Sequence, residues 1–209
     1  MIFDLHVHSL YSDGAATPSE IVKHAKDMGF AGVAITDHDE VAGALAALRL
    51  DLEDFVVIPG TEVSSIDGHI LALGVKQKIS RDLSAEATVD RIHALGGVAI
   101  AAHPFDKIRK GVGDLVYSVK FDAVEVYNGH TMWMSRTPEE IMKNLEVPAT
   151  GGSDAHTLSE LGAVTMDFPE GCDVLEAIIK GEGKISVNIS KSKILFNHLN
   201  RKLMKRRTP

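Results

Sequence analysis

The sequence predicts an α/β fold in a single domain, with the strands arranged as a TIM-like barrel. Short apolar runs alternate with helical stretches along the chain, and continuous apolar runs are typical of strands covered on both faces. About seven or eight such units follow one another, which favours a closed barrel over an open sheet. The chain has 209 residues, a length that suits one domain, and it contains no linker or internal repeat.

The strands are expected where short apolar runs end in glycine, proline or polar residues. The first, Ile2–Val7, sends alternate side chains to opposite faces, and Ala31–Thr36 is a continuous apolar run. A short turn at Asp67 and Gly68 separates two later strands. In chain order the expected strands cover residues 2–7, 31–36, 55–58, 69–73, 98–102, 123–127, 147–151, 164–168 and 184–188.

The helices are expected between the strands, where capping residues and apolar stripes occur. Thr17-Pro18-Ser19-Glu20 has the pattern of a helix start, with a threonine cap, proline at the first helical position and glutamate three residues after the cap. Gly29 closes this helix, and Gly96 closes a later one. In chain order the expected helices cover residues 17–28, 40–50, 84–95, 138–145 and 173–179, and one more follows residue 190.

The charge is distributed unevenly along the chain. The net charge is −7, but residues 190–209 contain seven lysines and arginines and no acid, which leaves 15 basic against 29 acidic residues before them. We therefore assign residues 1–189 to the barrel domain and residues 190–209 to a basic C-terminal helix or tail that packs on the barrel or extends from it. A solvated helix is the simpler interpretation, and contact with nucleic acid or an anionic substrate is the alternative.

The composition favours a cytoplasmic protein without a membrane segment. No apolar run approaches the about 18 residues that a membrane span needs. Asp4 interrupts the only apolar stretch that resembles the core of a signal peptide. The only cysteine, Cys172, cannot form an internal disulfide, which suits a reducing compartment. The sequence leaves the oligomeric state open.

Histidines and carboxylates recur at the ends of the expected strands. His6 and His8 lie two residues apart on a strand, so both imidazoles leave the same face. Two histidines on an apolar strand need partners, which either core hydrogen bonds or a divalent metal ion would supply. Seven further residues follow the same pattern or lie in the adjacent loops: Asp13, His38, Glu62, His69, His103, Asp154 and His156. So many convergent groups favour a polynuclear metal site, and a set without cysteine suits zinc, manganese or iron.

These residues lie in motifs that resemble those of the PHP family, which contains the polymerase and histidinol phosphatase domains. The motifs, in the family's order, are His6-Val-His8, Thr36-Asp37-His38, Gly60-Thr61-Glu62, Gly68-His69, Ala102-His103-Pro104 and Gly152-Ser153-Asp154-Ala155-His156. The resemblance implies a distorted (β/α)7 barrel that holds three metal ions. It implies that the three ions are held by His6, His8, Glu62 and Asp154, by Glu62, His69 and His103, and by Asp13, His38 and His156.

The implied activity is that of a metal-dependent phosphoesterase that hydrolyses a small phosphomonoester or a nucleotide with two to three divalent ions. A hydroxide that bridges two ions would attack phosphorus, and the ions would stabilise the developing negative charge. The expected catalytic residues are His38, Glu62, Asp154 and His156. The proton for the leaving group would come from His38, His156 or a metal-bound water.

Five more residues are expected next to the ligands or at the substrate. Asp37 either orients an imidazole or caps the helix that follows it. Glu125 and Asn128 end a strand, which places them near the mouth of the barrel. Arg109 and Arg136 either bind a substrate phosphate or are simply solvated.

Other interpretations of the chain remain open at this point. The barrel would serve as a scaffold for nucleic acid or protein if it acted like the RNase P subunit that shares this fold, and the basic C-terminus favours that role. An exonuclease that acts on oligonucleotides is a second alternative. A hydrolase of C–N or C–O bonds is a third, although the carboxylated lysine of amidohydrolases has no counterpart here. The Met132-Trp133-Met134 cluster either walls the pocket and stacks a base or packs in the core or an interface.

Overall fold

The structure is a computed structural model that describes residues 1–190. Its described part contains nine strands in one sheet, in the order β7-β6-β5-β4-β3-β2-β1-β8-β9. The strands are β1 (Ile2–Val7), β2 (Gly32–Ile35), β3 (Val56–Ser64), β4 (His69–Leu73), β5 (Val98–Ala101), β6 (Ala123–Asn128), β7 (Ala149–Gly152), β8 (Val164–Asp167) and β9 (Lys184–Val187). The α-helices are α1 (Pro18–Asp27), α2 (Ala42–Ala47), α3 (Ala85–Ala94), α4 (Pro138–Met142) and α5 (Val174–Lys180). Two short 3-10 helices cover Gly113–Tyr117 and Leu158–Glu160.

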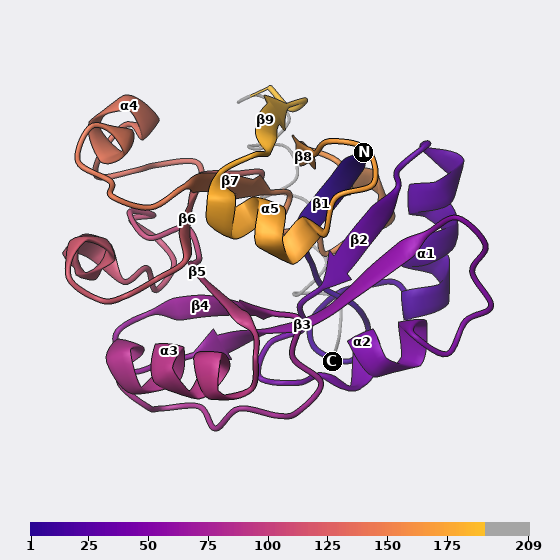
Figure 1. Ribbon diagram of the computed structural model, residues 1–209, viewed down its shortest axis with the longest axis horizontal. Helices are drawn as coiled ribbons and strands as arrows, with labels where there is room; N and C mark the ends of the chain where they lie inside the picture. Colours follow the sequence, from indigo (N-terminus) through magenta and orange to yellow (C-terminus); the bar gives the residue numbers. More distant parts are fainter. Residues whose placement is uncertain (191–209) are drawn as a thin grey trace, which may run out of the picture.

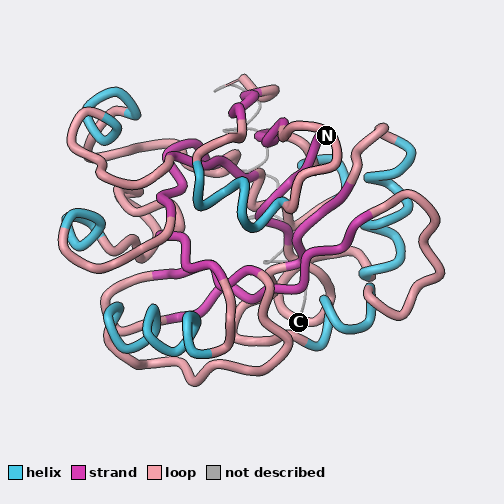
Figure 2. The backbone as a smooth tube through the Cα atoms, in the orientation of Figure 1, coloured by secondary structure: helices cyan, strands magenta, loops and turns pink. Residues whose placement is uncertain are grey.

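Strands β1 to β7 curl into a nearly closed barrel (Figure 1, Figure 2). The ring is completed just after β7, where Ala155 forms a parallel bridge with Val7 of β1. There the backbone N–H of His8 donates to the carbonyl oxygen of Ala155 over 2.8 Å, and the N–H of Ala155 donates to the carbonyl of His6 over 3.2 Å. Strands β8 and β9 extend the sheet beyond β1. The expected distorted TIM-like barrel in a single domain is confirmed.

The alternation of strands and helices predicts a parallel sheet, and this prediction is wrong at two places. Strand β4 runs antiparallel to both β3 and β5, and β8 runs antiparallel to both β1 and β9. Only four residues, 65–68, connect β3 to β4. A parallel connection needs a dozen residues or more, so these two strands can only form a hairpin.

Local sequence signals account for where most helices begin. At α1 the Thr17 side chain accepts the backbone N–H of Glu20 and the Glu20 side chain accepts that of Thr17, which is the expected capping box. Ser84 and Asp173 cap α3 and α5 in a similar way. Helices α2 and α4 end earlier than expected, at Ala47 and Met142. The basic helix expected in residues 190–209 lies outside the described residues.

The core closes one end of the barrel and leaves the other for polar residues. One apolar cluster joins Phe3 of β1, Leu73 of β4 and Val98 of β5 to Val174 and Ile178 of α5. These strand residues lie at the starts of β1 and β5 and at the end of the antiparallel β4. Helix α5 therefore covers the end of the barrel that is opposite to the carboxyl ends of the parallel strands, as its position across the ring in Figure 1 shows.

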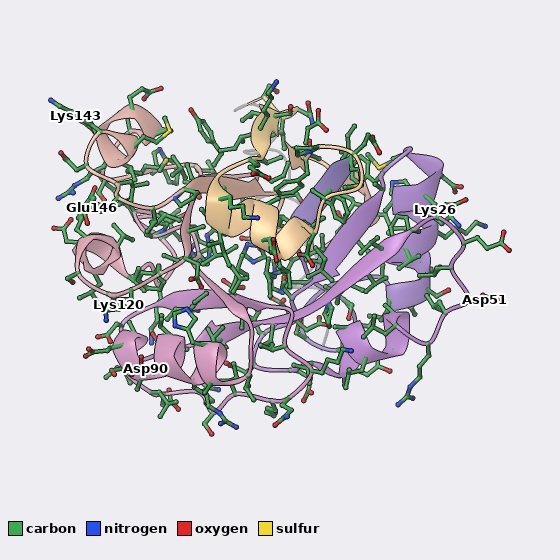
Figure 3. The ribbon with its side chains drawn as sticks, in the orientation of Figure 1. Lys26, Asp51, Asp90, Lys120, Lys143 and Glu146 are labelled. Atoms are coloured by element: carbon green, nitrogen blue, oxygen red, sulfur yellow. The ribbon has the colours of Figure 1, made fainter. Side chains whose placement is uncertain are left out.

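The other two apolar clusters lie between the sheet and the outer helices. Charged side chains such as Lys26, Asp90 and Lys120 project from the periphery of the molecule (Figure 3). Within residues 1–190, none of the helices has the length and apolar character needed to cross a membrane.

Candidate metal centre

The structure brings all nine side chains of the expected ligand set to the open end of the barrel. Strand β1 carries His6 and leads directly into His8, β3 carries Glu62, and β4 begins with His69. The other five lie in the loops that follow β1, β2, β5 and β7: Asp13, His38, His103, Asp154 and His156. Five of the nine are no more than 3% exposed: His6, His8, Glu62, His103 and Asp154.

Two of these residues have positive backbone φ angles, which are unfavourable for residues other than glycine. The φ angles of His103 and Asp154, each of which follows a strand, are +30° and +53°. Such conformations cost about 1–3 kcal/mol each and persist where the surrounding structure enforces them. Here they turn the chain sharply after β5 and β7 and direct both side chains into the mouth of the barrel.

Glu62 lies at the centre of the cluster. Its two carboxylate oxygens face a ring nitrogen of each of five imidazoles. Oε2 lies within 3.3 Å of three of these nitrogens and Oε1 lies 3.0 Å from the other two, the five residues being His6, His8, His38, His69 and His103. The Glu62 carboxylate is therefore shared by five imidazoles.

Within residues 1–190, four groups of side chains each offer potential ligand atoms that all lie within 4.8 Å of one another. They are His8, Asp13, His38 and His156; His6, His8 and Asp154; His38, Glu62 and His69; and His130, His156 and Glu160. The first three groups resemble the sets that the family motifs imply, but His103 is in none of the groups and Glu62 is in only one. His8 and His38 each belong to two of the first three groups, because His8 Nδ1 lies 4.0 Å from Asp13 Oδ1 and His38 Nδ1 lies 3.2 Å from Glu62 Oε2.

The acids and imidazoles change one another's pKa values. Burial alone would lower the pKa of His8, but the nearby carboxylates of Asp154 and Glu62 outweigh this effect and raise the pKa to about 9. Burial would raise the pKa of Glu62 and of Asp154, yet the neighbouring imidazoles, His6 foremost, hold both pKa values well below the usual range. At His38, by contrast, burial prevails and lowers the pKa. The cluster is thus a set of ionised carboxylates that are stabilised by cations.

The donor atoms of these residues are arranged in a way that suits divalent metal ions. Within residues 1–190, buried ring nitrogens of four cluster histidines make no hydrogen bond: His6 Nε2, His8 Nδ1 and Nε2, His69 Nδ1 and His103 Nδ1. Buried polar atoms without partners are costly, and metal ligation satisfies them. His8 Nε2 lies 3.3 Å from Glu62 Oε2 and 3.2 Å from Asp154 Oδ1. Tetrahedral ligands about 2.0–2.2 Å from a zinc ion are about 3.3–3.5 Å apart.

Glu125 and Asn128 lie directly behind the cluster, at the end of β6. Glu125 Oε1 is 2.9 Å from His6 Nδ1, so it orients the imidazole whose Nε2 faces Glu62. Glu125 Oε2 accepts the backbone N–H of His103 and an N–H of the Asn128 amide, each over 2.9 Å. Glu125 is therefore a buried carboxylate that orients one imidazole and the backbone of another.

Asp37 has a different role from either of those expected. Its carboxylate accepts the backbone N–H and the hydroxyl of Ser9 and the hydroxyl of Ser12, each over 2.7 Å. Its oxygens are thus engaged by a loop rather than by an imidazole, and α2 begins without a side-chain cap. Asp37 stabilises the loop after β1, which positions Asp13 in the cluster.

Arg109 and Arg136, which were expected either to bind a substrate phosphate or to be solvated, differ in position. Arg109 pairs with Asp154 through Nη1, and its Nη2 donates to Asn128 Oδ1 over 3.0 Å and to Thr131 Oγ1 over 2.7 Å. Its guanidinium therefore lies at the edge of the cluster.

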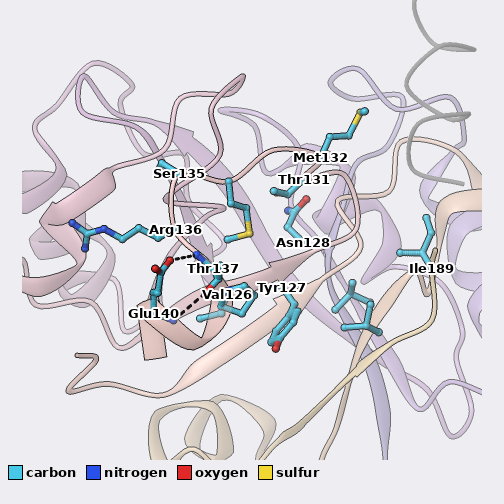
Figure 4. Close-up of a pocket in the computed structure, with 14 residues that line it drawn as sticks. Val126, Tyr127, Asn128, Thr131, Met132, Ser135, Arg136, Thr137, Glu140 and Ile189 are labelled. Carbon is cyan, nitrogen blue, oxygen red and sulfur yellow. Dashed lines mark hydrogen bonds between the residues drawn. The ribbon is translucent and has the colours of Figure 1, made fainter. Parts of the chain in front are cut away.

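Arg136 does not lie among the nine clustered side chains. It forms an ion pair of 2.7 Å with Asp114 and lies 4.9 Å above the ring of Phe105. A cavity of about 460 Å³ separates the 131–138 segment from β8 and β9. Figure 4 shows Arg136 directed away from Asn128 in the wall of that cavity.

Two buried acids and a histidine contribute to the site but were not predicted from the sequence. Asp4 accepts the backbone N–H groups of Ser153 and Gly162 and thereby holds the β7 loop against β1. It shares the two-residue period of His6 and His8, which is the signal that could have revealed it.

His130 and Glu160 extend the cluster at its edge. The His130 ring stacks on that of His156 at a centroid distance of 5.4 Å, and His130 Nε2 lies 3.3 Å from Glu160 Oε1. Glu160 also accepts the backbone N–H of His156 over 2.9 Å. His130 follows a strand end by two residues, a position that resembles those of the expected ligands.

The barrel and its cluster of histidines and carboxylates define a protein of the metal-dependent phosphoesterase class. Residues 4–156 match the PHP domain, and residues 136–182 match the PHP-associated family. The chain therefore belongs to the PHP domain family.

Three relatives illustrate the range of the family. An uncharacterised protein of Methanocaldococcus jannaschii is 37% identical over 139 residues, which cover 61% of this chain and 81% of that protein. A phosphoribosyl 1,2-cyclic phosphate 1,2-diphosphodiesterase of Eggerthella lenta is 43% identical over 84 residues, 37% of this chain and 32% of the relative. The 5′-3′ exoribonuclease Rnm of Salmonella typhimurium is 36% identical over 101 residues, 44% of this chain and 34% of the relative. The match thus spans about a third of each of the two named enzymes.

Solved structures share the fold. PsfC from Pseudomonas syringae superposes with a TM-score of 0.70 at 18% identity, over 97% of this chain and 98% of that one. A two-domain protein of Bacteroides vulgatus that contains a PHP-like phosphoesterase superposes with a TM-score of 0.67 at 18% identity, over 90% of this chain and 64% of that one.

Proposed function

We propose that this protein hydrolyses phosphate esters, a small phosphomonoester or a nucleotide, with two or three divalent ions held by the nine clustered side chains. The observation that carries this proposal is the convergence of Glu62 on five imidazoles, several of whose buried nitrogens make no hydrogen bond. Zinc, manganese and iron suit the nitrogen and oxygen donors. In the proposed division Glu62 would be a ligand of two ions, and Asp13, His38 and His156 would be the ligands of the third.

Different residues of this chain would have different roles in hydrolysis. The bound ions would supply a water nucleophile that is acidic enough to ionise near neutral pH, together with positive charge near the phosphoryl oxygens. Glu125 holds His6 in one orientation, and Asn128 supports Glu125. Arg109 offers a planar guanidinium at the edge of Asp154, where it would pair with an oxygen of the substrate phosphate.

Proton transfer to the leaving group is proposed for whichever of His38 and His156 does not ligate the third ion when substrate is bound. The His38 side chain is 30% exposed and that of His156 is 11% exposed, so both lie nearer to solvent than His6 and His8. A substrate that enters from the open end of the barrel would meet them first.

The scaffold alternative is weaker because a pure binding module gains nothing from a buried cluster of unsatisfied imidazoles. An exonuclease that acts on oligonucleotides would itself be a phosphoesterase. This alternative therefore specifies the substrate of the proposed hydrolase and does not contradict it. Sequence similarity to an exoribonuclease and to a cyclic phosphodiesterase is compatible with either monoester or diester substrates.

The proposal is tested by metal analysis combined with turnover. Purified protein should contain about two to three transition metal ions per chain and should hydrolyse 4-nitrophenyl phosphate or a nucleotide in a chelator-sensitive manner. The variant Glu62→Gln should lose turnover and part of its metal, because an amide cannot bridge two ions. Glu139→Gln, at an exposed position on α4, is the matched control and should retain both. Full activity of Glu62→Gln would contradict the proposed site. Absence of metal and of turnover after zinc or manganese is restored would favour a scaffold.

A further inference from the structure

The loops around the metal centre carry large exposed apolar side chains. Trp133 and Ile108 expose 56% and 54% of their surfaces, and Tyr11, in the loop that delivers Asp13, exposes 50%. A single exposed apolar residue is common on soluble proteins. Trp133 and Ile108, however, lie on two loops that are hydrogen-bonded to each other. The loop of Ile108 contains Arg109, and the loop of Trp133 contacts it.

The Trp133 loop is held firmly beside the metal centre. The backbone N–H of Lys107 donates to the carbonyl of Trp133 over 3.0 Å, and Asp106 forms an antiparallel bridge with Met134. Arg109 links the same loops to the cluster, since its guanidinium contacts both Thr131 and Asp154. Met134 packs against the core, whereas Trp133 faces solvent. The packing expected for this cluster thus holds for Met134.

Two exposed lysines lie on the loop that is hydrogen-bonded to the Trp133 loop. Lys107 and Lys110 are exposed on the loop that also carries Ile108 and Arg109, although the chain as a whole has a net charge of −7. A phosphate group of a ligand would bind the lysines, and an aromatic ring next to that phosphate would stack on the indole. Proteins that bind single-stranded nucleic acid combine basic side chains along the backbone with aromatic rings on which bases stack.

We propose that this loop pair binds a single-stranded oligonucleotide, with one base stacked on Trp133 and flanking phosphates held by Lys107 and Lys110. The inference rests on the proposed phosphoesterase function and names its substrate class, an oligonucleotide whose terminal or adjacent phosphate reaches the metal centre. Stacking requires an unpaired base, so duplexes are excluded. The charge complementarity of the lysines with phosphates distinguishes this partner from an uncharged ligand.

Trp133 is the only tryptophan of the chain, so its fluorescence reports on the site directly. The metal-loaded, full-length protein is titrated with a six-nucleotide oligomer carrying phosphorothioate linkages, which slow hydrolysis, and with an abasic oligomer of equal length. Anisotropy of a fluorescein label measures affinity for both. The base-containing oligomer should quench Trp133 saturably and bind more tightly than the abasic one by about 5-fold to 100-fold.

Two variants test the parts of the proposal separately. Trp133→Ala should abolish the advantage of the base-containing oligomer over the abasic one. Lys107→Gln with Lys110→Gln should reduce the slope of log affinity against log salt concentration by about 0.7 for each phosphate that a lysine no longer neutralises. Met142→Ala, at an exposed apolar position on α4, is the control and should change neither quantity. RNA and DNA oligomers of one sequence distinguish the two kinds of strand.

Equal affinity for the base-containing and abasic oligomers, or quenching only by anionic phospholipid vesicles, would overturn the inference. Turnover of 4-nitrophenyl phosphate by the wild-type protein is measured in parallel. If turnover is present while the base has no effect, the oligonucleotide platform is wrong and the phosphoesterase stands. If turnover is absent as well, the proposed function itself has failed.

Discussion

The substitution Glu125→Gln tests how far the metal centre depends on a carboxylate that is not among the nine proposed ligands. Glu125 receives three donors on two oxygens: His6 Nδ1, the backbone N–H of His103 and the Asn128 amide, each at 2.9 Å. A glutamine has a single acceptor oxygen on its side chain, so it cannot accept all three hydrogen bonds. The charge is lost while the shape of the side chain is kept.

Either orientation of the new amide is unfavourable. If its oxygen faces His6, its NH2 group meets the two N–H donors of His103 and Asn128, and buried donors without acceptors cost about 1–3 kcal/mol. If its NH2 group faces His6, it favours the tautomer with a proton on Nε2. That nitrogen is the one that faces Glu62 at 3.2 Å and Asp154 at 3.8 Å, and once protonated it cannot bind a metal ion.

The expected result is a loss of about 10-fold to 100-fold in affinity for the tightest metal site. This loss corresponds to about 1.4–2.7 kcal/mol of binding free energy. The assay is a competition titration of the metal-free protein with zinc or manganese against a chromophoric chelator, together with thermal unfolding of the metal-free protein. Glu139→Gln is the control for the loss of a charge. Wild-type metal affinity in a folded Glu125→Gln protein would refute the role assigned to the carboxylate.

Three further outcomes follow from the site. Because the pKa of His8 is raised to about 9, metal binding near pH 7 must displace its proton. Apparent affinity should therefore rise with pH up to about 9, and calorimetric heats that do not vary with buffer ionisation enthalpy would contradict this. Arg109→Lys keeps the charge but loses the planar fork, so KM for a phosphomonoester should rise about tenfold while metal content stays constant. In Gly43→Ala the new Cβ would lie 2.1 Å from Asp37 Oδ2 and 2.6 Å from Ser9 Oγ, so denaturant unfolding should show a loss of about 1–3 kcal/mol.

The order of the strands and helices could be predicted from local sequence signals, because caps and apolar runs act within a few residues. Thr17 and Glu20 predicted the start of α1, and the apolar run from Ala31 predicted β2. Strand direction and helix length could not be predicted in the same way, since they depend on the packing partners that each segment finds. Helix α2 illustrates this: its N-cap residue is the apolar Val41, and the helix ends after six residues.

The candidate site was predictable where the residues ended strands, and less so where their roles depended on distant partners. His6 and His8 could be placed on one face because a strand has a period of two residues. Asp37 lies beside His38 in the sequence, yet its partners, Ser9 and Ser12, come from a loop about 25 residues earlier. Arg109 and Arg136 could not be distinguished as phosphate ligands from the sequence. In the fold they have different partners, since Arg109 pairs with Asp154 and Arg136 pairs with Asp114.

The departure from the parallel sheet is what places His69 at the metal centre. In a parallel strand the first residue lies at the closed end of the barrel, where α5 packs. Because β4 is reversed, its first residue pairs with Ser64, next to Glu62, and its carbonyl accepts the N–H of Ala102 beside His103. Glu62 Oε1 can therefore contact His69 and His103 at once. A shift of one residue in this hairpin would turn His69 to the other face of the sheet. The four-residue connection at 65–68 is thus part of the architecture of the site, although none of its side chains is among the proposed ligands.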